Sequence, residues 1–259
     1  MIHPTAVIDP TVILATDVEI GPYAIIGKHV TIGKGTKVGA HAVIGDWTEI
    51  GENNHIFHQS SVGAPSQDLK YRGEECWTRI GDNNTIREFA TIHRGTVTGL
   101  SETVVGNNNL FMTYSHVAHD CVIGNGIVMA NVATLAGHVR VEDNVIIGGL
   151  AAVQQFSRIG AYSMVGGGTM VAMDILPYTI ATPGKRDAKL RGLNLIGLKR
   201  RGFSERAIAN LKIAYRILFM ADLDLPAAIV RIRNEISNSP EVDYLLAFID
   251  STQRGFCRG

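Results

Sequence analysis

An apolar residue recurs every six positions through nearly two-thirds of this chain. An α-helix repeats its apolar face about every 3.6 residues and a half-buried strand every second residue, so neither produces this period. A fixed internal period indicates a solenoid built from one repeated unit. The first series comprises Ile2, Ile8, Leu14, Ile20, Ile26, Ile32, Val38, Ile44, Ile50, Ile56 and Val62, and then Ile80, Ile86 and Ile92. The second series comprises Val105, Phe111, Val117, Ile123, Met129, Leu135, Val141, Ile147, Val153, Ile159, Val165 and Val171.

A six-residue unit with one inward aliphatic residue predicts a parallel β-helix, in which each unit forms a short strand and a corner. Three units would close one triangular coil, so inward residues three repeats apart, such as Ile2 and Ile20, should stack and bury each other. Glycine often follows the repeat residue, as at Gly21, where we expect it to permit unusual corner angles. An ordinary β-sandwich is the alternative, but it would not keep one phase for so long. The repeat resembles that of hexapeptide-repeat proteins, so we expect an all-β, left-handed prism.

Two interruptions divide the repeat. Residues 64–79 replace part of it without changing the phase, and residues 94–104 shift the phase by one position. Both are expected to be loops that leave the prism, and insertions in solenoids gather on one face, often the binding face. The alternative for either loop is an exposed excursion without a role. The repeat ends near Pro177, and we assign residues 1–184 to the β-helix.

The remaining residues, 185–259, have a different period. Apolar residues follow helical spacing over 204–221, and Pro226 and Pro240 fit the first turn of two further helices. We therefore expect a C-terminal α-helical cap. Such a cap would cover the inward residues and strand edges that the open end of a β-helix exposes.

Composition narrows the functional classes. Lys plus Arg and Asp plus Glu each number 24, so the total charge suggests no nucleic-acid partner. Cys76, Cys121 and Cys257 lack disulfide or metal-ligand spacing, which fits a reducing, cytoplasmic location. The N-terminus has no basic segment followed by an apolar core, so no signal peptide is expected. No apolar run is long enough to predict a transmembrane segment.

Two histidines and a carboxylate lie close together in the second series, at His116, His119 and Asp120. Val117 is the inward residue, so His119 should lie near the following corner. Histidine is the side chain best suited to exchange protons near neutral pH, and Asp120 or a carbonyl could orient it. The alternative is that each histidine is an ordinary surface residue.

The repeat aligns further polar positions with His119. One coil further along is Gly137, followed by His138, and one coil beyond that is Gln155. We therefore expect His119, Gly137 and Gln155 to stack along one edge of the prism. A histidine, a glycine N–H group and an amide on successive coils would form a small active site.

A zinc site is the competing interpretation of the same histidines. His116, His119 and His138 could bind the metal between subunits, as three histidines do in hexapeptide-repeat carbonic anhydrases. Strand positions three apart point to opposite faces, which disfavours His116 and His119 as joint ligands. A nonenzymatic scaffold would need none of these residues.

Longer motifs along the whole chain resemble one enzyme family. They are QDLKY at 67–71, TIHRGT at 91–96, HVAHDC at 116–121, LAGHV at 135–139, QF at 155–156 and GLKRRGFS at 197–204. The family is that of the acyl-[acyl carrier protein]–UDP-N-acetylglucosamine O-acyltransferases, which begin lipid A synthesis. The resemblance implies a homotrimer with active sites between neighbouring prisms. It also implies transfer of an (R)-3-hydroxyacyl group from acyl carrier protein to the sugar 3-hydroxyl.

The resemblance assigns three catalytic roles. His119 would be the general base, Asp120 would orient it, and the Gly137 amide would stabilise the oxyanion. No metal, cofactor or covalent enzyme intermediate is implied, because the acyl group arrives as a thioester on the phosphopantetheine of acyl carrier protein.

Further residues would bind the substrates. They are Asp68, Lys70, His93, His116, His138, Gln155, Asn194, Arg200 and Arg201. Asp68 and Lys70 would reach the sugar and phosphates or the pantetheine, and Asn194 and the two arginines would address the nucleotide. Gly167 would act as a ruler for the acyl chain, with Met170 nearby. A glycine there leaves the groove open and favours a long chain, C14 ahead of C12, although it could instead serve a tight corner.

Two positions depart from the family pattern. Gln154 stands where a histidine is usual, and Ile196 replaces a glutamate. The loss of an acidic side chain at Ile196 would affect nucleotide recognition. Separately, some relatives act on a sugar with a 3-amino group, so an amino acceptor is an alternative. A related N-acyltransferase that acts later in lipid A assembly is another alternative, but it carries an extra domain before the repeats, which here begin at Ile2.

The start of the cap is strongly basic. Its eight basic residues are Lys185, Arg186, Lys189, Arg191, Lys199, Arg200, Arg201 and Arg206, against Asp187 and Glu205. Such a patch would attract an acidic acyl carrier protein. The alternative is a solvated helix face.

Overall fold

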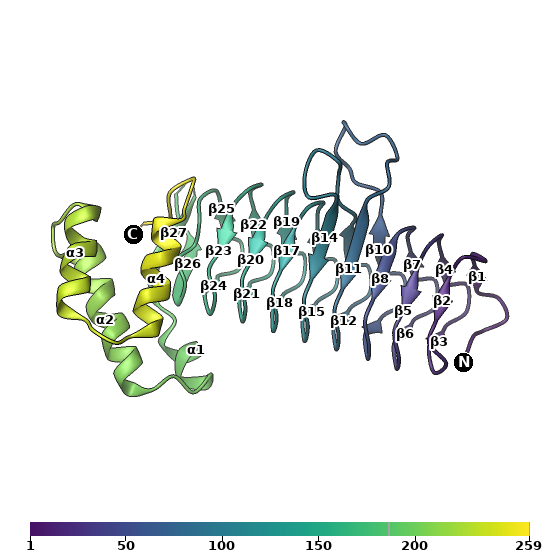
Figure 1. Cartoon of the computed structure of the whole chain (residues 1–259), viewed down its shortest axis with the longest axis horizontal. Coiled ribbons are helices and arrows are strands. Elements are labelled where there is room, and N and C mark those ends of the chain that lie inside the picture. The colour runs from purple at the N-terminus through teal and green to yellow at the C-terminus, as the bar shows by residue number, and fades with distance from the viewer. Residues whose placement is uncertain (186, 259) are drawn as a thin grey trace.

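Short parallel strands form the three faces of a long prism in the structure, a computed structural model that describes residues 1–185 and 187–258 (Figure 1). The first face holds, in spatial order, β1 (Val7–Ile8), β4 (Ile25–Ile26), β7 (Val43–Ile44), β10 (Ser61–Ala64), β13 (Thr91–His93), β16 (His116–Val117), β19 (Thr134–Leu135), β22 (Ala152–Val153) and β25 (Met170–Val171). The second face holds β2 (Ile13–Leu14), β5 (Thr31–Ile32), β8 (Thr48–Ile50), β11 (Trp77–Ile80), β14 (Glu102–Val105), β17 (Val122–Ile123), β20 (Arg140–Val141) and β23 (Arg158–Ile159). The third face holds β3 (Glu19–Ile20), β6 (Lys37–Val38), β9 (His55–Ile56), β12 (Thr85–Ile86), β15 (Leu110–Phe111), β18 (Val128–Met129), β21 (Ile146–Ile147), β24 (Met164–Val165), β26 (Thr179–Pro183) and β27 (Ala188–Leu193).

The register confirms the stacking that the repeat predicts. Ile2 bridges to Ile20, which pairs with Val38, which in turn pairs with Ile56. Ile20, Val38 and Ile56 are all buried in one continuous core that follows the axis of the prism. Each coil is therefore stabilised mainly by its two neighbours, as expected for a solenoid.

The glycines after the inward residues have a different role from the one predicted. Gly21 does not have a positive φ; the left-handed corner angle belongs to Tyr23, two residues further on, with φ of 57°. A Cβ atom on Gly21 would lie 2.7 Å from the backbone nitrogen of Ala40 in the next coil. Glycine is needed here because adjacent coils approach closely, and the expectation of unusual backbone angles at Gly21 was wrong.

Both interruptions leave the prism along one edge, where each first-face strand passes to the next second-face strand. We call this the loop edge. The first loop joins β10 to β11 and the second joins β13 to β14, and both project from the same side (Figure 1). Paired residues lie 30 positions apart across the first loop and 25 across the second, where uninterrupted coils give 18. These separations agree with the predicted phases.

The cap begins with a hairpin before any helix. β26 continues the third face and pairs antiparallel with β27, so the boundary predicted at 184/185 falls inside this hairpin. The described helices are α1 (Leu195–Arg200), α2 (Glu205–Met220), α3 (Leu225–Glu235) and α4 (Pro240–Asp250). Ser204 accepts a hydrogen bond from the N–H of Ala207 and so caps α2. The three longer helices agree with the sequence, whereas α1 was not predicted.

Polar contacts fasten the cap to the last coils. Arg158 Nε donates to Glu142 Oε1 at 2.7 Å, and the Tyr244 hydroxyl of α4 donates to the other oxygen of Glu142. Thr252 Oγ1 donates to Asp174 Oδ2 at 2.5 Å. The C-terminal tail, residues 251–258, is thereby held against the end of the prism. None of the helices in the described part of the chain has both the length and the apolar character needed to span a membrane.

Candidate active site

His119 and Asp120 form a hydrogen-bonded pair on the loop edge, between β16 and β17. His119 Nδ1 lies 2.8 Å from Asp120 Oδ2. The Asp120 side chain is fully buried, whereas the imidazole of His119 remains 15% exposed. Because Nδ1 faces a carboxylate, the proton of neutral His119 belongs on Nδ1, which leaves the Nε2 lone pair free to accept a proton.

The second loop holds Asp120 in place. The backbone N–H groups of Thr96 and Leu100 donate to Oδ1 at 3.1 and 2.7 Å, and Thr96 Oγ1 donates to Oδ2 at 2.6 Å. Burial raises the pKa of Asp120, but the hydrogen bonds from His119, Thr96 and Leu100 outweigh it, so the pKa is lowered overall. Asp120 is therefore ionised and suited to stabilise an imidazolium on His119.

Gly137 lies directly beneath the His119 ring. A Cβ atom on Gly137 would be 2.5 Å from Cε1 and 2.6 Å from Nε2 of His119, so any side chain would displace the imidazole. Within the described residues, the Gly137 N–H donates to no other backbone group. The stack of His119 over Gly137 that the repeat predicted is therefore present, and Nε2 lies close to the Gly137 backbone.

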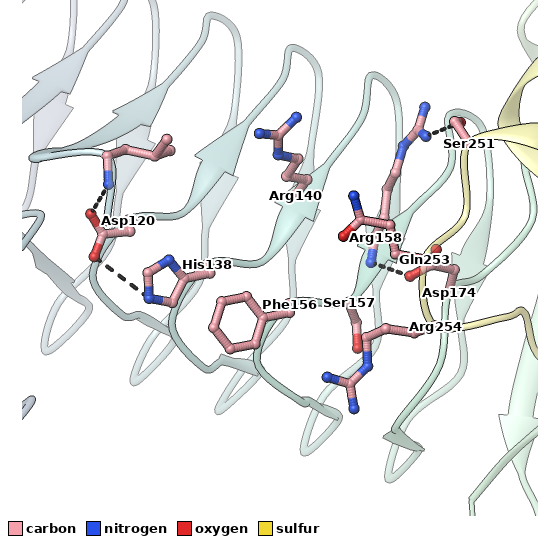
Figure 2. A pocket seen from close by; sticks show the side chains of 11 residues that line it. Asp120, His138, Arg140, Phe156, Ser157, Arg158, Asp174, Ser251, Gln253 and Arg254 are labelled. Atoms are coloured by element: carbon pink, nitrogen blue, oxygen red, sulfur yellow. Dashed lines mark hydrogen bonds and ion pairs between the residues drawn. The ribbon is translucent and has the colours of Figure 1, made fainter. Parts of the chain in front are cut away.

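His138 lies next to this pair. Its N–H donates to the carbonyl of His119 at 3.0 Å, and its Nε2 is 3.9 Å from Asp120 Oδ2 (Figure 2). The ring meets that of His119 edge-on and stacks against Phe156 with centroids 4.5 Å apart. Burial lowers the pKa of His138, which the charge of Asp120 partly opposes. Gln155 precedes Phe156 and is exposed on the same edge.

His93 and His116 form a second histidine pair on the first face. Their rings meet edge-on at 4.8 Å, and Thr91 Oγ1 lies 2.7 Å from His116 Nδ1. Burial, and then the neighbouring His116, lowers the pKa of His93 to about 4, and burial also lowers that of His116. Both rings are uncharged at neutral pH and offer hydrogen bonds to a polar ligand.

The first loop brings Asp68 toward the site. Its carboxylate accepts a hydrogen bond from the N–H of Lys70 at 2.9 Å. The negative charge of this carboxylate partly opposes the burial that lowers the pKa of His138. Lys70 is exposed. Both predicted loop residues thus lie on the side of the prism that carries His119.

One chain does not bring the predicted nucleotide-binding residues of the cap to His119. Asn194 caps α1: its side chain accepts from the N–H of Gly197 and donates to the carbonyl of Tyr162. Arg200 and Arg201 end the same helix and are exposed. Figure 1 places α1 on the side of the molecule opposite the two loops.

The predicted ruler residues lie away from the loop edge. Gly167 is at the edge between the third and first faces, where a Cβ atom would be 3.1 Å from the carbonyl oxygen of Gly149. Met170 points outward from the first face and is 57% exposed. It pairs with Ala152, which pairs with Thr134, which pairs with His116. Two small residues thus separate His116 from Met170 along this face.

The described residues contain one group suited to a metal ion, and it is not the predicted set. It consists of His119, Asp120 and His138, whose ligand atoms lie within 4.8 Å of one another. His116, which the zinc alternative required, lies outside this group. The hydrogen bonds donated to Asp120 by His119, Thr96 and Leu100 already occupy the carboxylate oxygens that a metal would use.

A pocket of about 370 Å³ opens beside the histidines on the second face (Figure 2). It runs from Asp120 and His138 along the prism to the C-terminal tail. Its lining comprises Leu100, Asp120, His138, Arg140, Phe156, Ser157, Arg158, Asp174, Ser251, Gln253 and Arg254.

Several residues of the site and its pocket were not predicted from the sequence. Thr96 lies in the TIHRGT motif, so its motif was noticed but not its contact with Asp120. Phe156 follows Gln155 and was part of the QF motif. Arg140 and Arg254 carried no signal in the sequence, because only the fold brings them together.

The β-helix and its carboxylate-supported histidine place the chain among the hexapeptide-repeat acyltransferases. The chain is 69% identical to the acyl-[acyl-carrier-protein]–UDP-N-acetylglucosamine O-acyltransferase of Trichlorobacter lovleyi over all of this chain and 99% of that protein. It is 53% identical to the enzyme of the same name from Myxococcus xanthus over 99% of both. Residues 174–257 match the family profile described as UDP N-acetylglucosamine O-acyltransferase, domain 2. The chain belongs to this family of acyltransferases.

Solved structures agree with this assignment. LpxA from Acinetobacter baumannii superimposes with a TM-score of 0.95 at 44% identity over 99% of both chains. The UDP-N-acetylglucosamine acyltransferase of Francisella novicida gives 0.96 at 37% identity, over all of this chain and 94% of the other. A β-helix wound in the opposite sense could not superimpose so closely, so the prism has the left-handed winding of these relatives.

Proposed function

We propose that this acyltransferase moves an (R)-3-hydroxyacyl group from acyl carrier protein to the 3-hydroxyl of UDP-N-acetylglucosamine, the first step of lipid A synthesis. The observation that carries the proposal is the His119–Asp120 pair, with Nε2 free beside the backbone of Gly137. The names of the relatives support the donor and the acceptor.

The chemistry needs one base and one oxyanion donor. His119 Nε2 takes the proton of the sugar hydroxyl while its oxygen attacks the thioester carbonyl. The resulting oxyanion accepts a hydrogen bond from Gly137 N–H; a donor of this kind lowers a barrier by about 3–4 kcal/mol. The intermediate then collapses, the C–S bond breaks, and the imidazolium returns its proton to the departing thiolate. Buried, ionised Asp120 stabilises the imidazolium while it exists.

Two uncharged histidines lie beside the acceptor position. His93 and His116 are held neutral by burial and offer hydrogen bonds to sugar hydroxyls without attracting an anion into the wrong place. Asp68, Lys70, His138 and Gln155 line the same side of the prism and complete the contacts to the sugar. No cofactor takes part, because the thioester is already activated.

The working form is a homotrimer in which neighbouring chains share each site. Within one chain α1, which ends at Arg200 and Arg201, lies on the side of the molecule opposite the two loops (Figure 1). The edge between the third and first faces also carries exposed apolar side chains, which a second copy would cover. They are Phe89, Tyr114, Val132 and Leu150. A neighbouring chain would bring its own α1 and Gly167 to the site.

The carrier protein docks on the basic start of the cap. Lys189 and Arg191 are exposed on β27, and the α1 arginines lie beyond them. Arg186, part of the predicted patch, lies outside the described residues. Acyl carrier proteins are acidic, so complementary charge would speed the encounter. The cytoplasmic location expected from the unpaired cysteines remains a prediction.

One assay tests the proposed function directly. The purified protein is given (R)-3-hydroxyacyl carrier proteins of C10 to C16, each with UDP-N-acetylglucosamine or its 3-amino analogue. We expect ester formation with the hydroxyl acceptor, fastest at C14. The 3-amino analogue tests the alternative acceptor. Faster amide formation would reject the hydroxyl acceptor, and absence of transfer to either sugar would reject the function.

A further inference from the structure

The pocket beside the catalytic pair is lined by more positive charge than the proposed reaction mechanism uses. Arg140, Arg158 and Arg254 all contribute to its wall (Figure 2). Its two carboxylates are occupied within the fold: Asp120 by the second loop and Asp174 by Arg158 N–H and Thr252 Oγ1. The pocket therefore presents a cationic surface one coil away from His119.

Two of the arginines are free to bind a ligand. Arg158 is held by Glu142 and by Ser251 Oγ. In the ranges 1–185 and 187–258, neither Arg140 nor Arg254 forms an ion pair, and both are exposed. Figure 2 shows their side chains on different sides of the pocket, with Gln253 between them. Guanidinium groups favour phosphate because their planar N–H groups match two oxygens at once.

The pocket leads from the catalytic edge toward the cap. Asp120 and Asp174 lie three coils apart, a span of roughly 14 Å at the usual spacing between strands. Asp174 N–H donates to Gly255 of the tail, and the tail carbonyl of Arg258 accepts from Leu190 N–H on β27. Leu190 lies between Lys189 and Arg191. A basic path thus connects the proposed carrier-protein surface with His119.

We infer that this pocket binds the phosphodiester of the donor's 4′-phosphopantetheine arm, with Arg140 and Arg254 as its principal ligands. The inference rests on the proposed function, which supplies a donor of that chemistry. The acceptor also carries phosphates, but its nucleotide is assigned to the α1 arginines that a neighbouring chain would bring to the site. An arm that enters from the cap passes Arg254 and Arg140 before its thioester reaches Gly137.

Calorimetric binding to the whole protein, without acceptor, tests the inference separately from turnover. The probes are (R)-3-hydroxyacyl-4′-phosphopantetheine and the same compound without its phosphate. The variants are Arg140→Ala and Arg254→Ala, with Arg231→Ala on α3 as the matched control for loss of an exposed arginine. We expect each pocket variant to bind the phosphorylated probe about tenfold more weakly, the usual effect of losing one charged hydrogen bond.

Further measurements distinguish the phosphate from the rest of the ligand. Affinity for the phosphate-free probe should change less than about twofold, Arg140→Lys should retain part of the affinity, and added salt should weaken only the phosphorylated probe. Equal affinity of wild type and both variants for the phosphorylated probe would overturn the inference. The inference would also be overturned if the two pocket variants lost affinity for UDP and kept their affinity for the phosphorylated probe. Failure of the proposed function is a different result: absence of transfer from acyl carrier protein by the wild type, whatever the binding data.

Discussion

The imidazole of His119 lies over the α-carbon of Gly137 so closely that a methyl group on Gly137 would meet its ring at 2.5 Å. Gly137→Ala should therefore displace His119 and reduce turnover by about 10²-fold or more, within the range seen for loss of general-base catalysis. The measurement is a double-mutant cycle with His119→Ala, which removes the clash. If displacement of the ring is the cause, Gly137→Ala should cost little in the His119→Ala background. An equal additional loss there would show that the substitution acts in another way.

Thr96 positions Asp120 through its hydroxyl. Thr96→Val removes the 2.6 Å hydrogen bond to Oδ2 but keeps the backbone N–H bond to Oδ1. Because that bond lowers the pKa of Asp120, its loss should raise this pKa, move the acidic limb of the pH–rate profile upward and reduce kcat about tenfold. Exposed Thr98→Val is the control, because it removes the hydroxyl 3.2 Å from Thr96 Oγ1 but keeps the Thr96 hydroxyl that bonds Asp120. An unshifted profile in Thr96→Val would refute the positioning role.

His93 should make stability depend on pH. Its pKa of about 4 in the folded protein lies below the ordinary value of 6.5, mainly because it is buried. As the pH falls, His93 therefore becomes protonated in the unfolded chain before it does in the folded protein. The contribution of neutral His93 to the free energy of unfolding is complete above about pH 6.5 and is lost toward pH 4. The shift corresponds to a few kcal/mol at about 1.4 kcal/mol per unit. Urea unfolding at pH 7.5 and 5 should show a smaller acid-induced loss in His93→Gln. The same loss in variant and wild type would contradict the burial account.

The size of the side chain at position 167 should set the acyl length, and Gly167 leaves room for a long chain. Its Cβ position is 3.1 Å from the Gly149 carbonyl and otherwise open, so a long side chain would extend outward from the prism. Gly167→Met should shift the preferred donor several carbons shorter, because each buried methylene contributes about 0.8 kcal/mol. Competition among carrier-protein donors measures the preference, with Met170→Ala as the converse change toward longer chains. Equal loss on every length would favour a structural role for the glycine.

The parts of the fold that could be predicted from the sequence are those that the six-residue repeat determines. Ile20 and Val38 face inward because a six-residue period leaves only one phase for apolar residues, and the same period places Gly137 under His119. The β26–β27 hairpin and α1 carry no long period, so their order could not be deduced. The contacts of Thr96 with Asp120 and of Arg254 with the pocket depend on segments distant in sequence. The glycines were correctly noticed but misinterpreted, because close approach between coils leaves no trace in one sequence.

The central claim is that His119 removes the acceptor proton, and turnover of His119→Ala tests it most directly. Rates are measured with acyl carrier protein thioester and UDP-N-acetylglucosamine, alongside thermal unfolding and the oligomeric state of the same preparation. Asp120 and the second loop do not depend on the imidazole for their other contacts, so the variant should remain folded. The account predicts a loss of about 10²–10⁴-fold in kcat, the usual contribution of a general base. Turnover close to that of the wild type in a folded His119→Ala protein would contradict it.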